Sequence, residues 1–297
     1  MANLRDIRRR IKSVKNTAQI TKAMQLVAAS KMKKAQDQAT SGRPYAELLN
    51  RVLNNLSERT TAEDHPLLRD EDGGPELVIL ITTDKGLCGP LNTNLLRLVM
   101  EQVPKDSTFI TIGNKGRQAV VRQKRGLLAD FSVKDPVSFV ETKPVSDFVM
   151  ERFLSGEFNR VRVAFTNFVN TIKQEPLLET LLPICPIELG KKKDFEGMGE
   201  DTVPCIPEGP EYGGYLFEPS TRDVLDVAVP QYVGYQFYQM MLESRASEHS
   251  ARMVAMKSAT DNAKQMIKDL TLEYNKQRQA AITAELLEIT TAMRALE

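Results

Sequence analysis

The sequence contains few of the residues from which catalytic centres and metal sites are built. Its 297 residues include two histidines, three cysteines and no tryptophan. His65 and His249 are far apart in the chain, and Cys88, Cys185 and Cys205 lack the short spacing of zinc ligands. We therefore expect no metal site, and we interpret Cys88 as a buried, unreactive thiol in a reducing compartment. Cys185 and Cys205 are either two free thiols or a redox pair.

Long apolar runs are also absent. No stretch approaches the ~20 apolar residues of a membrane span, and the basic N-terminus lacks the apolar segment of a secretory signal. The net charge is only +1, so no overall field favours binding to nucleic acid. We therefore expect no segment of the chain to span a membrane by itself.

The last part of the chain lacks the two residues that break helices most strongly. No proline follows Pro230 and no glycine follows Gly234, which leaves more than sixty residues without either. A continuous helix of this length would extend roughly 100 Å. No compact domain buries a helix so long, so the sequence predicts a C-terminal helix over about 221–297 that pairs with another helix.

Apolar residues at alternating spacings of three and four identify the partner at the other end of the chain. The N-terminal positions are Leu4, Ile7, Ile11, Val14, Ala18, Thr21, Gln25, Ala28, Met32, Ala35 and Ala39. The C-terminal positions are Ala246, His249, Met253, Met256, Thr260, Ala263, Ile267, Leu270, Tyr274, Gln277, Ala281 and Ala284. Both are heptad seams, typical of a coiled coil, with two helices of a larger bundle as the alternative. We expect Gly42-Arg43-Pro44 to kink or interrupt the first helix.

Positive charge is concentrated in the first helix. Residues 1–34 contain ten lysines and arginines and one acidic residue, and all ten basic side chains lie off the seam. A solvated helix face is the usual meaning of such a run. A helix that follows the phosphates of DNA is a second interpretation, although no base-reading residues accompany it.

The middle of the chain alternates strands and helices. Strands are expected at 77–81, 108–112 and 161–169, with helices around 94–99, 117–124 and 145–154. Residues 175–230 hold eight of the fifteen prolines and six of the sixteen glycines, which predicts an irregular segment. The fold class is therefore α/β: a long antiparallel coiled coil (1–57 and 221–297) with an inserted small Rossmann-like α/β domain (75–220) that is irregular over 175–220.

A glycine-containing loop follows the first strand of this domain. A strand, a glycine-rich turn and a helix N-terminus can together hold phosphate. However, Gly86-x-x-Gly89 matches neither G-x-G-x-x-G nor G-x-x-x-x-G-K-[ST]. We favour glycines that permit a tight turn, and a nucleotide-binding α/β protein stays as the alternative function.

Four segments are similar to a single family. They are IRRRIKSVKNTAQITKAMQLVAASKM (7–32), TDKGLCGPLNTNL (83–95), SEHSARMVAMKSATDN (247–262) and YNKQRQAAITAELLEI (274–289). Together they resemble the gamma subunit of rotary F-type ATP synthases, over both ends almost without a gap and over the middle in outline. Pro90 stands where the family usually has a second glycine, and Ala292-Met293 stands where a Gly-Ala pair is usual.

The resemblance implies a mechanical role. In the family, the coiled coil stands in the cavity of a hexamer of three alpha and three beta subunits. The globular part sits on the membrane-embedded ring of c subunits, beside the epsilon subunit. Proton or sodium flow turns the ring and the shaft, which drives the beta subunits through their nucleotide-binding states. The resemblance therefore implies one copy per complex, and no catalytic residue, cofactor, metal or nucleic acid on this chain.

The resemblance also implies contact residues. By match to the family, Met24 and Arg252 lie where the coil meets the moving lever of the beta subunit, and Arg8 and Arg9 belong to the basic face that meets the hexamer. Further contacts with the alpha/beta hexamer are expected at Arg278, Gln279, Thr283 and Glu285, and contacts of the foot with the c ring and epsilon at Tyr215, Phe217 and Glu218. Met24 as simple packing and Glu285 as a solvated charge are the alternatives.

The resemblance finally implies a location. The chain would associate with the membrane only through the complex, as a peripheral subunit on the cytoplasmic face of the bacterial plasma membrane. The other open alternative is a coiled-coil scaffold or nucleic-acid binder.

Overall fold

The computed structural model describes residues 4–57, 65–69, 73–184, 218 and 220–294, without the side chains of Thr221 and of part of 40–57. Cys185, Cys205, Tyr215 and Phe217 lie outside the described residues. The chain forms two compact units: 1–28 with 253–297, and 29–252. Two long helices contribute to both units, α1 (Leu4–Ser57) and α5 (Thr221–Arg294).

The unit formed by 29–252 contains a five-stranded mixed sheet. Its strands are β1 (Glu76–Ile81), β2 (Thr108–Ile112), β3 (Gly126–Phe131), β4 (Arg160–Phe168) and β5 (Gln174–Leu182). The order is β3-β2-β1-β4-β5, and only β5 is antiparallel to its neighbour. The central strand β1 reads Leu77-Val78-Ile79-Leu80-Ile81 and is buried throughout, because helices cover both faces of a parallel sheet.

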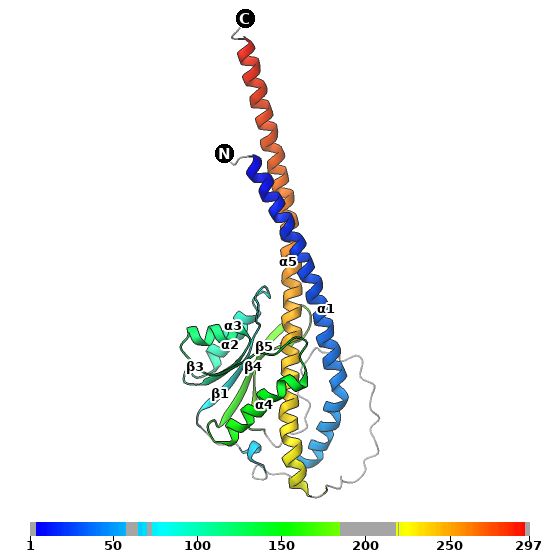
Figure 1. Ribbon diagram of the computed structural model, residues 1–297, viewed down its shortest axis with the longest axis vertical. Helices are drawn as coiled ribbons and strands as arrows, with labels where there is room; N and C mark the ends of the chain where they lie inside the picture. The colour runs from blue at the N-terminus through cyan, green and yellow to red at the C-terminus, as the bar shows by residue number, and fades with distance from the viewer. Residues whose placement is uncertain (1–3, 58–64, 70–72, 185–217, 219, 295–297) are drawn as a thin grey trace. The chain divides into compact units, whose positions relative to one another are not determined.

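The two faces of the sheet form two separate hydrophobic clusters. On one face, Val78 and Leu80 pack against α2 (Leu91–Gln102) and α3 (Asn114–Arg122). On the other face, Leu77 and Ile79 pack against α4 (Phe139–Leu154), residues 225–246 of α5 and the part of α1 around Ala35. Figure 1 shows α2 and α3 on the opposite side of the sheet from α4. The first half of α5 is therefore a core helix, and residues 240–251 are buried without a break.

Several elements differ from the expectations. β3 was not expected, and β5 occupies part of 175–220, where the composition predicted irregular structure. Pro176 does not prevent a strand here, because β5 lies at the edge of the sheet. A proline is tolerated in an edge strand, where one row of backbone N–H groups has no partner strand. α4 begins at Phe139, before the expected start at 145, and a short 3-10 helix (Pro66–Leu68) was also not expected.

A kink or an interruption of the first helix was expected at Gly42-Arg43-Pro44, and the interruption is wrong. α1 is a single helix from Leu4 to Ser57, with Pro44 inside it. The Tyr235 hydroxyl of α5 donates a hydrogen bond to the Gly42 carbonyl at 3.0 Å. A Cβ at Gly42 would lie 3.1 Å from that hydroxyl oxygen, which is a tight contact. The glycine therefore permits close approach of a tyrosine and does not end the helix.

In the unit formed by 1–28 and 253–297, α1 and α5 pair along the expected seam. Ile7, Thr21 and Ala28 of α1, and Met256, Thr260 and Ala263 of α5, are buried. The remaining seam positions from Leu4 to Ala281 are partly buried, and the two hydroxyl oxygens of Thr21 and Thr260 are 2.7 Å apart. Figure 1 shows these two helices side by side and antiparallel. Among the described residues of this unit they are the only helices, which argues against a larger bundle within the chain.

The C-terminal end of α5 has no partner helix among the residues that the structure describes. Every residue from Ile282 to Arg294 is exposed, and Ala281 is the last partly buried seam position. Figure 1 shows α5 continuing beyond the start of α1. This is the arrangement expected for an antiparallel pair in which the second helix is the longer one.

The seam generates a stability prediction. Ala263→Leu places a large side chain where the two helices approach closely, and overpacking of this kind costs about 1–3 kcal/mol. We expect faster amide hydrogen exchange in residues 4–28. Ala280→Leu is the matched control, since Ala280 is exposed on the same helix. Equal exchange rates in the two variants would contradict close packing at this seam.

Candidate functional site

The described residues present interaction surfaces and no catalytic cluster. No group of three or more histidine, cysteine, aspartate or glutamate side chains within them is placed to hold a metal ion. No described helix is both long enough and apolar enough to cross a membrane. The candidate sites are therefore the exposed faces of the long helices, the place where α5 meets the sheet, and the first turns of α5.

The unpaired end of α5 exposes large apolar side chains. They are Ile282, Leu286, Leu287, Ile289 and Met293, each about half exposed or more. Threonine hydroxyls here donate hydrogen bonds within the helix: Thr283 donates to the Gln279 carbonyl at 2.9 Å and Thr290 to the Leu286 carbonyl at 3.0 Å. The apolar side chains of this end therefore offer a partner non-directional contact, beside the polar side chains that are also exposed. The expected contact residues Arg278, Gln279, Thr283 and Glu285 are all exposed.

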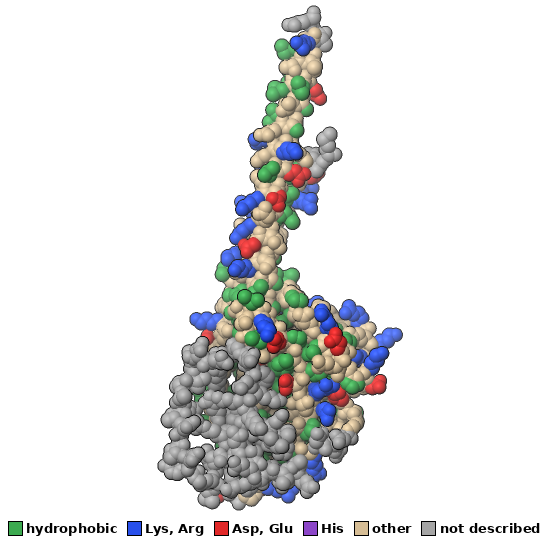
Figure 2. Space-filling view, turned by 180° about the vertical axis from the view of Figure 1, so that it is seen from behind, with side chains coloured by type: hydrophobic (Ala, Val, Ile, Leu, Met, Phe, Trp, Pro, Cys, Tyr) green, Lys and Arg blue, Asp and Glu red, His purple; other side chains and the backbone are tan. Residues whose placement is uncertain are grey.

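The N-terminal half of α1 has a second exposed apolar group beside its basic residues. Ile20, Met24, Leu26 and Val27 are off the seam, and Met24 is 40% exposed. Arg8 and Arg9 are also exposed. On the face shown in Figure 2, charged and hydrophobic side chains are interspersed along the helices of this unit. Met24 is thus partly open to a partner and partly packed within the chain.

Arg252 differs from the other expected contact residues because it is engaged within the chain. Its side chain is only 17% exposed, and its Nη2 donates to Glu248 Oε1 at 2.8 Å. The same nitrogen donates to the carbonyls of Lys85 and Gly86 at 3.3 and 3.4 Å. Glu248 also accepts from Arg245 at 2.8 Å. Arg252 thus holds the glycine loop against α5.

The glycine loop is closed by its own side chains. Asn92 accepts from the Thr83 backbone N–H at 3.3 Å, and its Nδ2 donates to Thr83 Oγ1 at 2.7 Å. Cys88 is 2% exposed and packs against Leu91 and Ala251. The expectation of a buried thiol at Cys88 is confirmed.

The position where a doubly wound sheet usually binds its ligand is filled by α5. Such a crevice lies outside the carboxyl ends of the strands where the strand order reverses, which here is between β1 and β4. Ser247 of α5 donates to the Thr166 carbonyl at 3.0 Å, and Ser250 donates to the Thr171 carbonyl at 2.9 Å. These contacts are next to those of Arg252 with the glycine loop, so the crevice is occupied by the protein's own helix.

The N-terminus of α3 has also satisfied its amide groups within the chain. The N–H of Asn114 donates to Asp84 Oδ1 at 3.2 Å, that of Lys115 to the Thr83 carbonyl at 3.1 Å, and that of Gly116 to Thr82 Oγ1 at 2.7 Å. A carboxylate therefore already occupies the place that a phosphate would take at this helix end.

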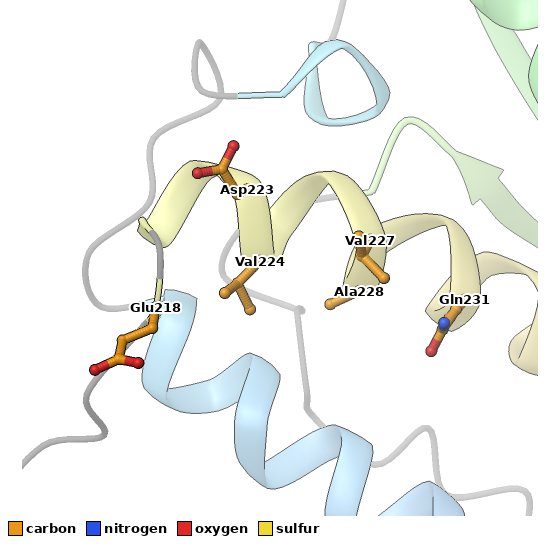
Figure 3. A pocket seen from close by; sticks show the side chains of 6 residues that line it. All are labelled: Glu218, Asp223, Val224, Val227, Ala228 and Gln231. Atoms are coloured by element: carbon orange, nitrogen blue, oxygen red, sulfur yellow. The ribbon is translucent and has the colours of Figure 1, made fainter.

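The first turns of α5 border a shallow hollow. It measures about 400 Å³ and is lined by Glu218, Asp223, Val224, Val227, Ala228 and Gln231. Figure 3 shows the two carboxylates at one end of the row and Gln231 at the other. Glu218 is the only expected foot residue among those described, and it is exposed. Apolar walls with two acidic side chains suit contact with a partner better than chemistry.

One charged cluster had no signal in the sequence. Asp135, in the segment after β3, lies with its Oδ2 2.6 Å from Lys31 Nζ of α1 and 3.2 Å from His249 Nε2 of α5. Contact with His249, followed by that with Lys31, holds the pKa of Asp135 well below its usual range, although partial burial acts to raise it. The three residues are 104 and 114 positions apart along the chain, so only the fold brings them together.

Comparisons with known proteins give a consistent answer. The family model described as ATP synthase matches residues 3–296. The chain is 51% identical to the ATP synthase gamma chain of Akkermansia muciniphila and 46% identical to that of Methylacidiphilum infernorum, over the full length of each protein.

A similar fold occurs in solved structures of ATP synthases. A chain of the Euglena gracilis mitochondrial ATP synthase (OSCP/F1/c-ring) is 23% identical, with a TM-score of 0.65 over 99% of this chain and 94% of that one. At this identity the likeness supports the fold alone. The full-length identity to curated relatives carries the assignment: the chain belongs to the family of ATP synthase gamma chains.

Proposed function

We propose that this chain is the central rotor shaft of an F-type ATP synthase and transmits torque between the membrane c ring and the alpha/beta hexamer. The observation that carries the proposal is the bare end of α5. A helix that leaves its partner and exposes Ile282, Leu286 and Ile289 in sequence needs an apolar sleeve from other subunits. Non-directional contacts in such a sleeve permit rotation, and polar contacts beside them would have to form and break as the shaft turns.

The proposed partners are the alpha, beta and epsilon subunits and the c ring, with one copy of this chain per complex. The chain would be peripheral, on the cytoplasmic face of the bacterial plasma membrane. Proton or sodium flow would drive the rotation. We propose that ATP chemistry takes place on the beta subunits and that this chain has no catalytic residue and no cofactor.

The proposed contacts fall into two classes. Arg8, Arg9 and Met24 would meet the hexamer along α1, and the end of α5 would meet it through Arg278, Gln279, Thr283 and Glu285; the exposure of all seven supports these contacts. Arg252 would contact the beta lever only together with the glycine loop, because its donors are shared with Glu248 and that loop. Tyr215, Phe217 and Glu218 are proposed for the foot.

The nucleotide-binding alternative has little physical support. The ligand crevice is filled by α5, and the α3 N-terminus is satisfied by Asp84. The nucleic-acid alternative rests on the basic face of α1, whose exposed apolar neighbours Ile20, Leu26 and Val27 suit a protein surface better than a phosphate backbone.

The filled crevice predicts that the isolated chain does not bind nucleotides. Titration calorimetry with ATP or NAD should show no saturable heat in the micromolar range. Saturable binding by the wild type, strengthened when Asp84 is replaced by alanine and the α3 N-terminus is freed, would support the nucleotide-binding alternative and contradict the proposed function.

The basic face of α1 gives a charge prediction. Reversing Arg8, Arg9 and Arg10 together to glutamate should weaken assembly or coupling with the alpha and beta subunits and leave the circular dichroism of the isolated chain unchanged. Exposed charges contribute little to stability within a chain. The control reverses Lys105, Arg122 and Lys124, which are exposed on the α/β domain and change the net charge equally. Equal loss in both variants would assign the effect to net charge and not to this surface.

The bare end of α5 gives a third test. Truncation after Thr290 removes Met293 and part of the apolar stripe but no group placed for chemistry. We expect lower assembly yield or torque, with ATP hydrolysis by the assembled complex retained. Complete loss of hydrolysis in a fully assembled truncated complex would place a catalytic role in 291–297 and contradict the proposed division of labour.

A further inference from the structure

Within the unit formed by 29–252, the segment after β3 bonds to both long helices. This segment, residues 132–138, connects β3 to α4. Toward α1, Asp135 pairs with Lys31, and the Val137 carbonyl accepts from Gln38 Nε2 at 3.2 Å. Toward α5, the same Asp135 oxygen faces His249, and the Val133 carbonyl accepts from Arg245 Nη2 at 3.1 Å. We call this segment the bracket.

Among the hydrogen bonds and ion pairs of the described residues, Asp135 is the residue of the bracket whose side chain makes polar contacts with both helices. One of its oxygens is shared between an ammonium group on α1 and an imidazole on α5. The Lys31 pair is half exposed, and such a pair alone contributes little. The His249 contact is different, because the imidazole is 4% exposed.

The surroundings of His249 make the carboxylate hard to replace. Both ring nitrogens are buried and neither makes a well-aligned hydrogen bond in the part of the chain that the structure describes, so the 3.2 Å contact of Nε2 with Asp135 is the charged contact that faces the ring. Other charged groups on this stretch of α5 are engaged elsewhere. Glu243 accepts from the Phe168 N–H, and Arg245, Glu248 and Arg252 bond to each other and to backbone carbonyls. Removing the carboxylate would leave a buried imidazole unpaired and detach the bracket from α1 at the same position.

Hydrogen bonds from Ser247, Ser250 and Arg252 hold α5 to the sheet and the glycine loop, so the motion that is more weakly opposed is that of α1 relative to them. Small side chains such as Ala35 and Ala39 allow close approach, and apolar contacts resist separation. Contacts of this kind are non-directional, so they oppose sliding or twisting less than a hydrogen bond or ion pair does. A shaft under load must resist sliding and twisting.

We propose that Asp135 is a positioning residue that locks α1, α5 and the α/β sheet in one register, so that they turn as a single body under load. This inference rests on the proposed rotor function. The Asp135 carboxylate is the one side chain of the bracket that pairs with charged or titratable groups on both helices, beside the single hydrogen bonds from Gln38 and Arg245. Its loss should therefore allow part of the imposed rotation to be lost as twist. We therefore expect a lower ratio of ions pumped to ATP hydrolysed, and no loss of ATP hydrolysis on the catalytic subunits.

The test uses the assembled complex in membrane vesicles. For Asp135→Asn we expect the ratio of ions pumped to ATP hydrolysed to fall, with a larger loss as the opposing ion gradient rises, while hydrolysis itself is retained. Asp135→Glu keeps the negative charge and should recover much of the ratio. Asp147→Asn is the matched control, since Asp147 is an exposed aspartate on the neighbouring helix α4, and its ratio should equal that of the wild type.

A second variant covers failure of folding. If Asp135→Asn gives no complex, the ratio of ions pumped to ATP hydrolysed is measured for Lys31→Met instead, and we expect it to fall. This variant removes the contact with α1 and leaves the contact between Asp135 and buried His249 in place. A wild-type ratio in the variant that assembles would overturn the inference and leave the proposed function intact. A wild-type chain that never joins a complex with ATP-driven pumping would instead overturn the proposed function.

Discussion

The pairing of α1 with α5 along a narrow seam is the contact on which the unit of 1–28 and 253–297 depends. A two-helix pair has no sheet or third helix to bury its apolar surface, so its stability comes from one continuous stripe. Ile7, Met256 and Ala263 are buried there, and the two hydroxyls of Thr21 and Thr260 meet inside it. Mostly small side chains bring the backbones close. This leaves the remaining faces exposed and available to partners.

α5 serves three structural purposes along its length. Residues 240–251 are buried in the unit of 29–252, where serines replace the larger side chains that a core helix usually carries. Ser247 and Ser250 use their hydroxyls to bond to carbonyls around the end of β4, so the helix approaches the sheet directly. From Met253 the helix is buried only along its seam, and after Ala281 it is fully exposed. The residue types of α5 therefore differ among these three stretches in accordance with how much of the helix is exposed to solvent.

The α/β domain has the topology of a nucleotide-binding fold but uses its ligand edge for another purpose. In a doubly wound sheet the carboxyl ends of the strands form a natural crevice. Here that edge holds α5 through Arg252, the two serines and the packing of Ala251 against Cys88. The crevice that would bind a ligand has become a site for attaching a long helix. A site defined by fold alone would therefore have been assigned the wrong function.

The sequence alone determined the features that repeat or that persist over many residues. The heptad positions from Leu4 to Ala39 and from Ala246 to Ala281 are the less exposed ones in the structure, because a period of three and four places them on one face of a helix. Absence of proline and glycine predicted the length of α5, and the run at 77–81 predicted the buried central strand. The family resemblance supplied the proposed contact residues, of which Arg8, Met24 and Glu285 are exposed.

Tertiary structure decided what depends on a single contact between distant segments. Gly42 and Pro44 are locally a helix break, but a tyrosine nearly two hundred residues away packs on Gly42 and the helix continues. Local residues likewise give no sign that Arg252 is engaged by the glycine loop, or that Asp135 meets both Lys31 and His249. Periodicity reports which face of an element is buried, whereas the identity of the partner on that face is set only when the whole chain has folded.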